Sequence, residues 1–140
     1  MSVAEILLPL FVQVVLTFVL LYRMAWIRSG ILRRREVAAS DIALRQPAWP
    51  ARAMQAANAF HNQLELPLLF YVLVILALIT RNADFLFVAL SWIFVISRIV
   101  HALIHTTYNK VPHRGLSFAF GCVILSVMWI VFMVRILIVH

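Results

Sequence analysis

Four polar side chains interrupt an apolar stretch of the sequence at a spacing that would bring them together on a helix. They stand at positions i, i+3, i+4 and i+7 and are Asn58, His61, Asn62 and Glu65. In an α-helix these positions share one face. Amides, an imidazole and a carboxylate can exchange several hydrogen bonds, and the carboxylate can hold a cationic group. The spacing therefore predicts a polar stripe on one helix.

A second polar stripe follows about forty residues later. Arg98, His101 and His105 stand at i, i+3 and i+7 and would share a helix face. We expect the two stripes to face each other and Glu65 to pair with Arg98 in a polar cavity. Such a pair could serve only to fix the register of two helices. The surplus of polar side chains around it favours a small polar or anionic ligand instead.

The histidines allow a metal site as an alternative. His101 and His105 are four residues apart, as are His61 and Glu65, and imidazole and carboxylate groups at this spacing can bind one metal ion. Two such pairs arise easily by chance, and no third motif supports them. The metal interpretation is therefore the weaker one.

The composition indicates whether these stripes belong to a soluble protein or to a membrane protein. Of 140 residues, 65% are hydrophobic and 12% are charged, against roughly 45–50% apolar residues in soluble domains. A single cysteine excludes an internal disulfide framework. The net charge of +7 would suggest nucleic acid in a soluble chain, but most arginines are clustered between apolar runs. This pattern is typical of membrane topology and does not favour nucleic-acid binding.

Four apolar segments are long enough to cross a bilayer as helices. The sequence predicts an all-α integral membrane protein, a single domain over residues 1–140 that folds as a four-helix bundle. Gln13 is expected to form an interhelical hydrogen bond, and Arg135 to extend toward the lipid headgroups. The expected spans are 4–27, 54–80, 83–107 and 115–139.

The arginines predict how the bundle is oriented. Residues 23–52 hold seven arginines and two carboxylates, a net charge of +5, and basic loops stay in the cytoplasm. The loop after the third span carries Lys110, His113 and Arg114 and should lie on the same side. Both termini would then lie on the non-cytoplasmic side. Arg33, Arg34 and Arg35 are expected to fix the orientation and to contact anionic lipids.

Two sequence blocks resemble those of a known family. NAFHNQLELPLLFY contains an Asn-x-x-Glu motif at Asn62 and Glu65 with a proline soon after, and RIVHALIHTTYNKVPHRGLSF contains Arg-x-x-His at Arg98 and His101. Arg114 stands sixteen residues after Arg98, which is the family spacing. Together with the length and the four spans, the chain resembles the membrane-associated proteins in eicosanoid and glutathione metabolism, the MAPEG superfamily of microsomal glutathione transferases.

This resemblance implies a homotrimer in which glutathione, as co-substrate, lies between subunits at the cytoplasmic side. A lipophilic substrate would arrive from the membrane, here the inner membrane of a bacterium. Arg98 and Arg114 would bind or polarise the glutathione anion, Glu65 would meet its ammonium group and Asn62 its backbone amides. His101 and His113 complete the expected binding site.

Two positions depart from the family pattern. Asn58 stands where catalytic members carry an arginine, and His105 stands where many carry a tyrosine whose hydroxyl contacts the thiol. A histidine can also donate a hydrogen bond to sulfur, and Tyr108 is a further candidate donor. The sequence thus predicts a glutathione-dependent transferase or peroxidase, with a non-catalytic membrane protein that binds lipid or a membrane partner as the alternative.

Overall fold

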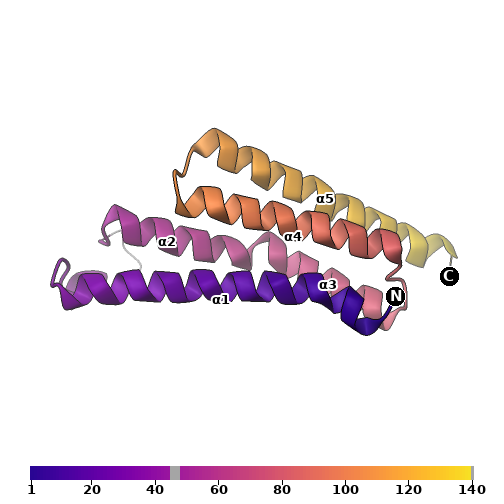
Figure 1. Ribbon diagram of the computed structural model, residues 1–140, viewed down its shortest axis with the longest axis horizontal. Helices are drawn as coiled ribbons and strands as arrows, with labels where there is room; N and C mark the ends of the chain where they lie inside the picture. Colours follow the sequence, from indigo (N-terminus) through magenta and orange to yellow (C-terminus); the bar gives the residue numbers. More distant parts are fainter. Residues whose placement is uncertain (45–47, 140) are drawn as a thin grey trace.

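Five α-helices and two short 3-10 helices form the described part of the chain, residues 1–44 and 48–139 of a computed structural model (Figure 1). The long helices are α1 (Val3–Arg33), α4 (Phe85–Thr106) and α5 (Val111–Val139). Between α1 and α4 lie η1 (Ala39–Ile42), α2 (Ala51–His61), η2 (Asn62–Leu64) and α3 (Leu66–Ile79). All regular structure in these residues is helical, as the composition predicted.

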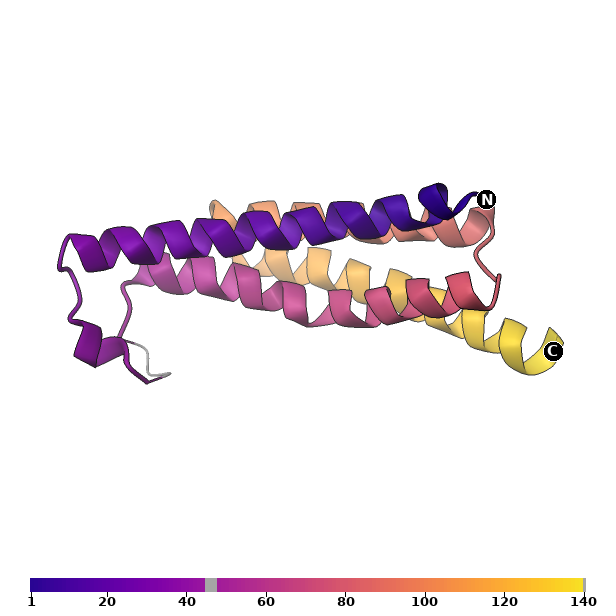
Figure 2. The same cartoon turned by 90° about the horizontal axis from the view of Figure 1, so that it is seen from below.

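The helices run alternately up and down in a bundle (Figures 1 and 2). Four segments are long and apolar enough to span a membrane: α1, the stretch Ala51–Ile79 that contains α2 and α3, α4, and α5 as far as Ile138. Both termini lie at one end with the α3–α4 turn, whereas the α1–α2 connection and the α4–α5 turn lie toward the other end (Figure 1). The prediction of an all-helical chain with four spans is confirmed.

Side chains at the helix ends fix where these helices begin. Ser2 caps α1 by accepting a hydrogen bond from the Glu5 backbone N–H at 3.2 Å, and the Glu5 carboxylate accepts one from the Ser2 N–H at 2.6 Å. Asp84 caps α4 by accepting from the Phe87 N–H at 2.9 Å. Such caps satisfy N–H groups that have no partner within a helix.

The main apolar core is formed by α3, α4 and α5 together with the start of α1, which contributes Ile6. The rings of Phe70 and Phe94 lie 4.8 Å apart between centroids, and both side chains are fully buried with Leu73 and Val95. At Gly121, a Cβ atom would lie 3.0 Å from Ser97 Oγ, so the absence of a side chain lets α5 approach α4 closely. The close α4–α5 contact places the start of α5 against the polar face of α4.

The second span is broken in its middle, which corrects the prediction that it is one helix through residues 54–80. The α-helical bonding ends at His61, and Glu65 adopts φ −96° and ψ −102° before α3 begins. Pro67 explains the break, because it has no N–H to donate and its ring collides with the carbonyl four residues earlier. The break changes which side chains of this span can face α4.

A hydrogen bond between two glutamines connects α1 to the broken region of the second span. Gln13 Nε2 donates a hydrogen bond to Gln63 Oε1 at 2.9 Å, and Gln63 Nε2 donates to the Ala59 carbonyl at 3.3 Å. Both side chains are buried. The interhelical hydrogen bond predicted for Gln13 is confirmed.

Arg135 has protein partners at the end of the bundle. Its guanidinium donates to Asp84 Oδ2 at 2.7 Å and to the Asn82 carbonyl at 3.4 Å. Its extension toward the headgroups stays a prediction. The end of α5 lies against the α3–α4 turn (Figure 1), and the Asp84 carboxylate there gives Arg135 a partner that helical periodicity could not reveal.

Candidate functional site

Arg98 is the centre of the polar cluster in the bundle. It lies on α4, its side chain is fully buried, and its Nη2 donates a hydrogen bond to Asn62 Oδ1 in η2. Asn62 Nδ2 in turn donates to Glu65 Oε2 at 3.3 Å. Asn62 therefore links the arginine to the carboxylate.

The predicted direct pair between Glu65 and Arg98 is wrong. The ion pairs of residues 1–44 and 48–139 do not include these two side chains, and Glu65 is exposed on the surface of the chain. The break after His61 is the reason, because it leaves Glu65 at the N-terminal boundary of α3 while Asn62 takes the place opposite Arg98.

The Arg98 guanidinium has unused hydrogen-bond donors. Its Nε and Nη1 atoms are buried and have no partner in the part of the chain that the structure describes. The Phe118 ring centroid lies 5.7 Å from its Cζ, a distance at which a ring face attracts a cation. Because arginine stays charged in proteins, a buried guanidinium with one hydrogen bond has a strong tendency to bind an anion.

The two predicted histidines share the inner face of α4 with Arg98. His101 and His105 are both buried, and their rings lie 5.6 Å apart. His101 Nδ1 lies 3.1 Å from the Arg114 carbonyl and 3.2 Å from Ser117 Oγ. Within the described residues, His101 Nε2 and His105 Nδ1 have no partner. The predicted common face for these three α4 residues is confirmed.

Arg114 lies in the first turn of α5 beside this cluster. Its side chain is half-buried, and its Nη1 donates to Asn109 Oδ1 at 2.8 Å. Its backbone carbonyl meets His101, as described above. The α4–α5 turn thus brings a second guanidinium to the end of the candidate site where α4 ends.

Arg23 and Gln55 hold the end of α4 and were missed by the sequence interpretation. Arg23 Nη2 donates to the Thr106 carbonyl at 3.3 Å, and Gln55 Nε2 donates to the His105 carbonyl at 2.8 Å. The last carbonyls of a helix have no partner within it, so these side chains fix the position of His105. The sequence does contain a signal for Gln55, because it lies three residues before Asn58 and extends the polar stripe of the second span by one helical turn.

The remaining members of the first stripe do not face α4. Asn58 and His61 are exposed, as Glu65 is, so the prediction of two facing stripes holds only for Asn62. Asn58 and His61 precede the break and lie on the exposed side of α2, whereas Glu65 follows the break at the N-terminal boundary of α3. A polar patch of Asn58, His61 and Glu65 therefore lies on the outer surface of the second span.

Tyr108 and His113 lie apart from the Arg98 cluster. The Tyr108 hydroxyl is 3.1 Å from His113 Nδ1, and both residues line an apolar groove of about 760 Å³ between α4 and α5. Arg98 and Asn62 do not line this groove. The other lining residues are Ile93, Ile96, Ser97, Val100, Ile104, Leu116, Ser117 and Phe120.

The structure gives the metal alternative no support. Over residues 1–44 and 48–139, no three side chains of His, Cys, Asp or Glu come close enough together to hold a metal ion. The His61–Glu65 pair and the His101–His105 pair do not combine, since the first pair is exposed and the second is buried.

The comparisons with known proteins identify the family. Residues 6–134, nearly the whole chain, match the model of the MAPEG family. No curated protein and no solved structure shows significant similarity to the chain. The match reaches into all four spans and includes both polar blocks, and the chain therefore belongs to the MAPEG family.

Proposed function

We propose that the protein is a membrane enzyme that uses glutathione to modify or reduce a lipophilic substrate. The observation that carries this proposal is Arg98, a fully buried guanidinium whose Nε and Nη1 have no partner in the described residues. Glutathione has two carboxylates and an ionisable thiol, so it offers the anion that such a group favours. Family membership agrees with this co-substrate.

The side chains near Arg98 match the other groups of glutathione. Arg98 and Arg114 would bind a carboxylate or the thiolate, and the Glu65 carboxylate would receive the ammonium group. Asn62 would exchange hydrogen bonds with the peptide groups, since an amide both donates and accepts. A positive charge beside the sulfur favours the thiolate, which is the form that attacks an electrophilic carbon and makes a carbon–sulfur bond.

The histidines of α4 would assist the thiol. His105 Nδ1 is buried without a partner in the described residues, and its backbone is fixed by Gln55. One imidazole nitrogen can donate a hydrogen bond to sulfur and the other can accept the thiol proton. His101, which contacts the start of α5, would position the ring of His105 and line the site.

The lipophilic substrate would enter from the membrane through the groove between α4 and α5. Its walls are apolar, and Tyr108 and His113 stand among the lining residues. Tyr108 and His113 would contact the polar end of the substrate. Ser117 lines the groove and also lies 3.2 Å from His101 Nδ1, so the groove and the polar cluster are separated by little more than one side chain.

The exposed polar patch of the second span supports a homotrimer. Asn58, His61 and Glu65 lie on the surface of a membrane span, and a carboxylate that faces lipid costs from about 2.5 kcal/mol upward. A neighbouring subunit would cover the patch and complete the site. Because basic loops stay in the cytoplasm, we place the α1–α2 and α4–α5 connections there and both termini on the other side; the inner membrane of a bacterium is the membrane we propose.

The runner-up function is that of a non-catalytic MAPEG protein that binds lipid or a membrane partner. It is favoured by Asn58, which is exposed and uncharged where catalytic members carry an arginine, and by the apolar groove. The two functions differ in whether glutathione binds at Arg98.

Glutathione binding and turnover, measured together on the purified protein in lipid nanodiscs, test the proposal. Calorimetric titration should show binding that weakens about ten- to a hundredfold in Arg98→Gln, since a hydrogen-bonded charge is lost. Conjugation of a lipophilic electrophile should fall in parallel. Arg135→Gln, which changes an arginine at the other end of the bundle, is the matched control. Wild-type protein that binds no glutathione would support the non-catalytic function instead.

A further inference from the structure

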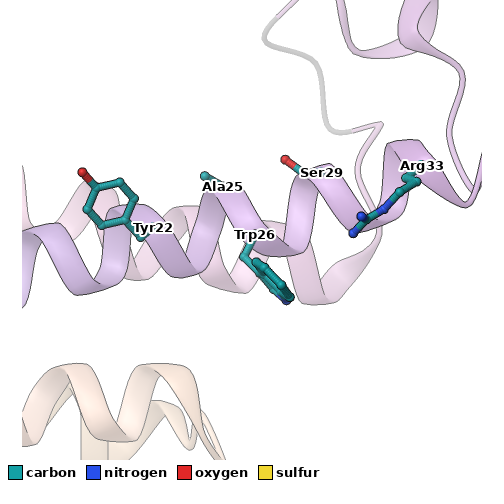
Figure 3. Close-up of a pocket in the computed structure, with 5 residues that line it drawn as sticks. All are labelled: Tyr22, Ala25, Trp26, Ser29 and Arg33. Atoms are coloured by element: carbon teal, nitrogen blue, oxygen red, sulfur yellow. The ribbon is translucent and has the colours of Figure 1, made fainter.

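The outer face of the last turns of α1 carries a shallow hollow that the Arg98 site does not use. Its lining residues are Tyr22, Ala25, Trp26, Ser29 and Arg33, and its volume is about 470 Å³ (Figure 3). Tyr22, Trp26, Ser29 and Arg33 follow at i, i+4, i+7 and i+11, so they form a ladder along one face of the helix. The exposed fraction is 67% for Tyr22 and 77% for Trp26.

The ladder changes from aromatic to charged along the helix axis. With a rise of about 1.5 Å per residue, Trp26 lies roughly 10 Å and Tyr22 roughly 16 Å from the level of Arg33. The headgroup layer on each side of a bilayer is about 5–8 Å thick. With Arg33 at headgroup depth, the two rings reach the upper acyl chains. Figure 3 shows the Arg33 side chain turned back along α1, toward Ser29 and Trp26.

Three other arginines at this end of the bundle have partners. Arg34 and Arg52 both bind Glu36, at 2.8 Å and 2.6 Å, and together they lower the pKa of that carboxyl below its usual value, with Arg52 the larger cause. Arg28 lies over the Trp49 ring at 4.9 Å. Among the described residues, no ion pair involves Arg33.

We propose that this hollow is a binding site for an anionic phospholipid, with the phosphate at Arg33 and Ser29 and the glycerol and upper acyl chains along Trp26 and Tyr22. A guanidinium and a hydroxyl donate hydrogen bonds to phosphate oxygens, and aromatic side chains favour the interface. The local excess of arginine selects a headgroup with net negative charge. Ala25, the small residue of the lining, adds no bulk to the hollow.

This site differs from general attraction to a basic loop. Arg35 has the same charge, is exposed and stands two residues further on, but it does not line the hollow. An ordered site depends on Arg33 far more than on Arg35, whereas diffuse attraction depends on both equally. The inference is independent of whether the Arg98 cluster binds glutathione.

Native mass spectrometry of the full-length protein, titrated with phosphatidylglycerol or phosphatidylcholine of the same chains, tests the site. We expect preferential retention of phosphatidylglycerol, about tenfold weaker retention in Arg33→Gln, and less than about twofold change in Arg35→Gln. Equal losses in the two variants, or equal retention of the two lipids, would overturn the proposal.

Tryptophan quenching checks the same site in a bilayer. Phosphatidylglycerol brominated on its upper acyl chains should quench the wild-type protein more than Trp26→Leu, and more than brominated phosphatidylcholine does. Because Trp26 is exposed, this substitution leaves the core intact. Equal quenching of wild type and Trp26→Leu would mean that another surface, such as a second copy of the chain, covers this face, and the proposal would be wrong.

Discussion

Asn62 accepts a hydrogen bond from the guanidinium of Arg98 although the two residues lie 36 positions apart and on different spans. This contact occupies the place where an Arg98–Glu65 ion pair was expected. An amide leaves the positive charge of the arginine uncompensated, whereas a carboxylate would cancel it. The central arginine is therefore both held in position and available to a negatively charged ligand.

Asn62→Asp should separate the structural and ligand-binding roles of this contact. A carboxylate at position 62 can still accept the hydrogen bond, so we expect the thermal midpoint in detergent to stay near the wild-type value or to rise. Glutathione affinity should fall about tenfold, because the new negative charge neutralises Arg98. Asn62→Leu, which leaves the guanidinium with no protein partner, should destabilise the fold by about 1–3 kcal/mol. Unchanged glutathione affinity in Asn62→Asp would contradict this role.

His105→Phe should slow the reaction of the thiol more than it weakens glutathione binding. The substitution keeps a planar aromatic ring but removes a donor near the sulfur, for which a loss of roughly a hundredfold in kcat is typical. Steady-state kinetics with a lipophilic electrophile, together with a binding titration, give the two quantities. A changed KM with an unchanged kcat would show that His105 contributes to binding only and not to the chemical step.

Substitution of the two glycines at the start and middle of α5 should have opposite effects. Gly121→Val forces a side chain into a space where even a Cβ atom lies 3.0 Å from Ser97 Oγ, and overpacking of this kind costs about 1–3 kcal/mol. At Gly115 a Cβ atom meets nothing within 4 Å, so Gly115→Ala should stabilise α5 by up to about 1 kcal/mol. Unfolding curves in mixed detergent should show a lower free energy of unfolding for Gly121→Val and a higher one for Gly115→Ala. Destabilisation by Gly115→Ala would show that a neighbouring subunit contacts this position.

The Asp84–Arg135 pair should give a small, specific pH dependence. The hydrogen bond from Arg135 holds the pKa of the Asp84 carboxyl below its usual value, which burial opposes. The pair therefore stabilises the fold at pH above about 4, the unfolded value, and this contribution is lost as the pH falls through the lower folded-state pKa. Both groups are partly exposed, so its size is below about 1 kcal/mol.

Asp84→Asn should remove this dependence without disturbing the start of α4. Asparagine caps helices as well as aspartate does, so only the charge is lost. A double-mutant cycle with Arg135→Gln, read from unfolding midpoints at neutral and acidic pH, gives the interaction energy. If the pH dependence persists in Asp84→Asn, another titratable group must cause it.

The helical period of the sequence was sufficient to predict which side chains of α4 share a buried face. Because α4 is uninterrupted, Arg98, His101 and His105 fall on one buried face, as their spacing predicted. The same argument failed for the second span, where Pro67 breaks the helix and leaves Glu65 on the surface. Pro67 itself was the available signal, since a proline within a helix removes a hydrogen bond and displaces the preceding turn.

Contacts between distant elements could not be predicted in this way. The pairing of Arg135 with Asp84 depends on how α5 ends against the α3–α4 turn. The separation of Tyr108 and His113 from Arg98 likewise depends on how the α4–α5 turn closes. Periodicity assigns a side chain to a face of its own helix, but it does not identify the element that packs there.

The ionisation of bound glutathione tests most directly whether the buried charge of Arg98 serves thiol chemistry. The ultraviolet absorbance of the thiolate, followed against pH with the protein in excess, reports the pKa of the bound thiol. We expect that pKa to lie well below about 8.5, the value of an ordinary thiol, and to return toward it in Arg98→Gln under saturating glutathione. A bound thiol that ionises at its ordinary pKa in the wild-type protein would contradict the account.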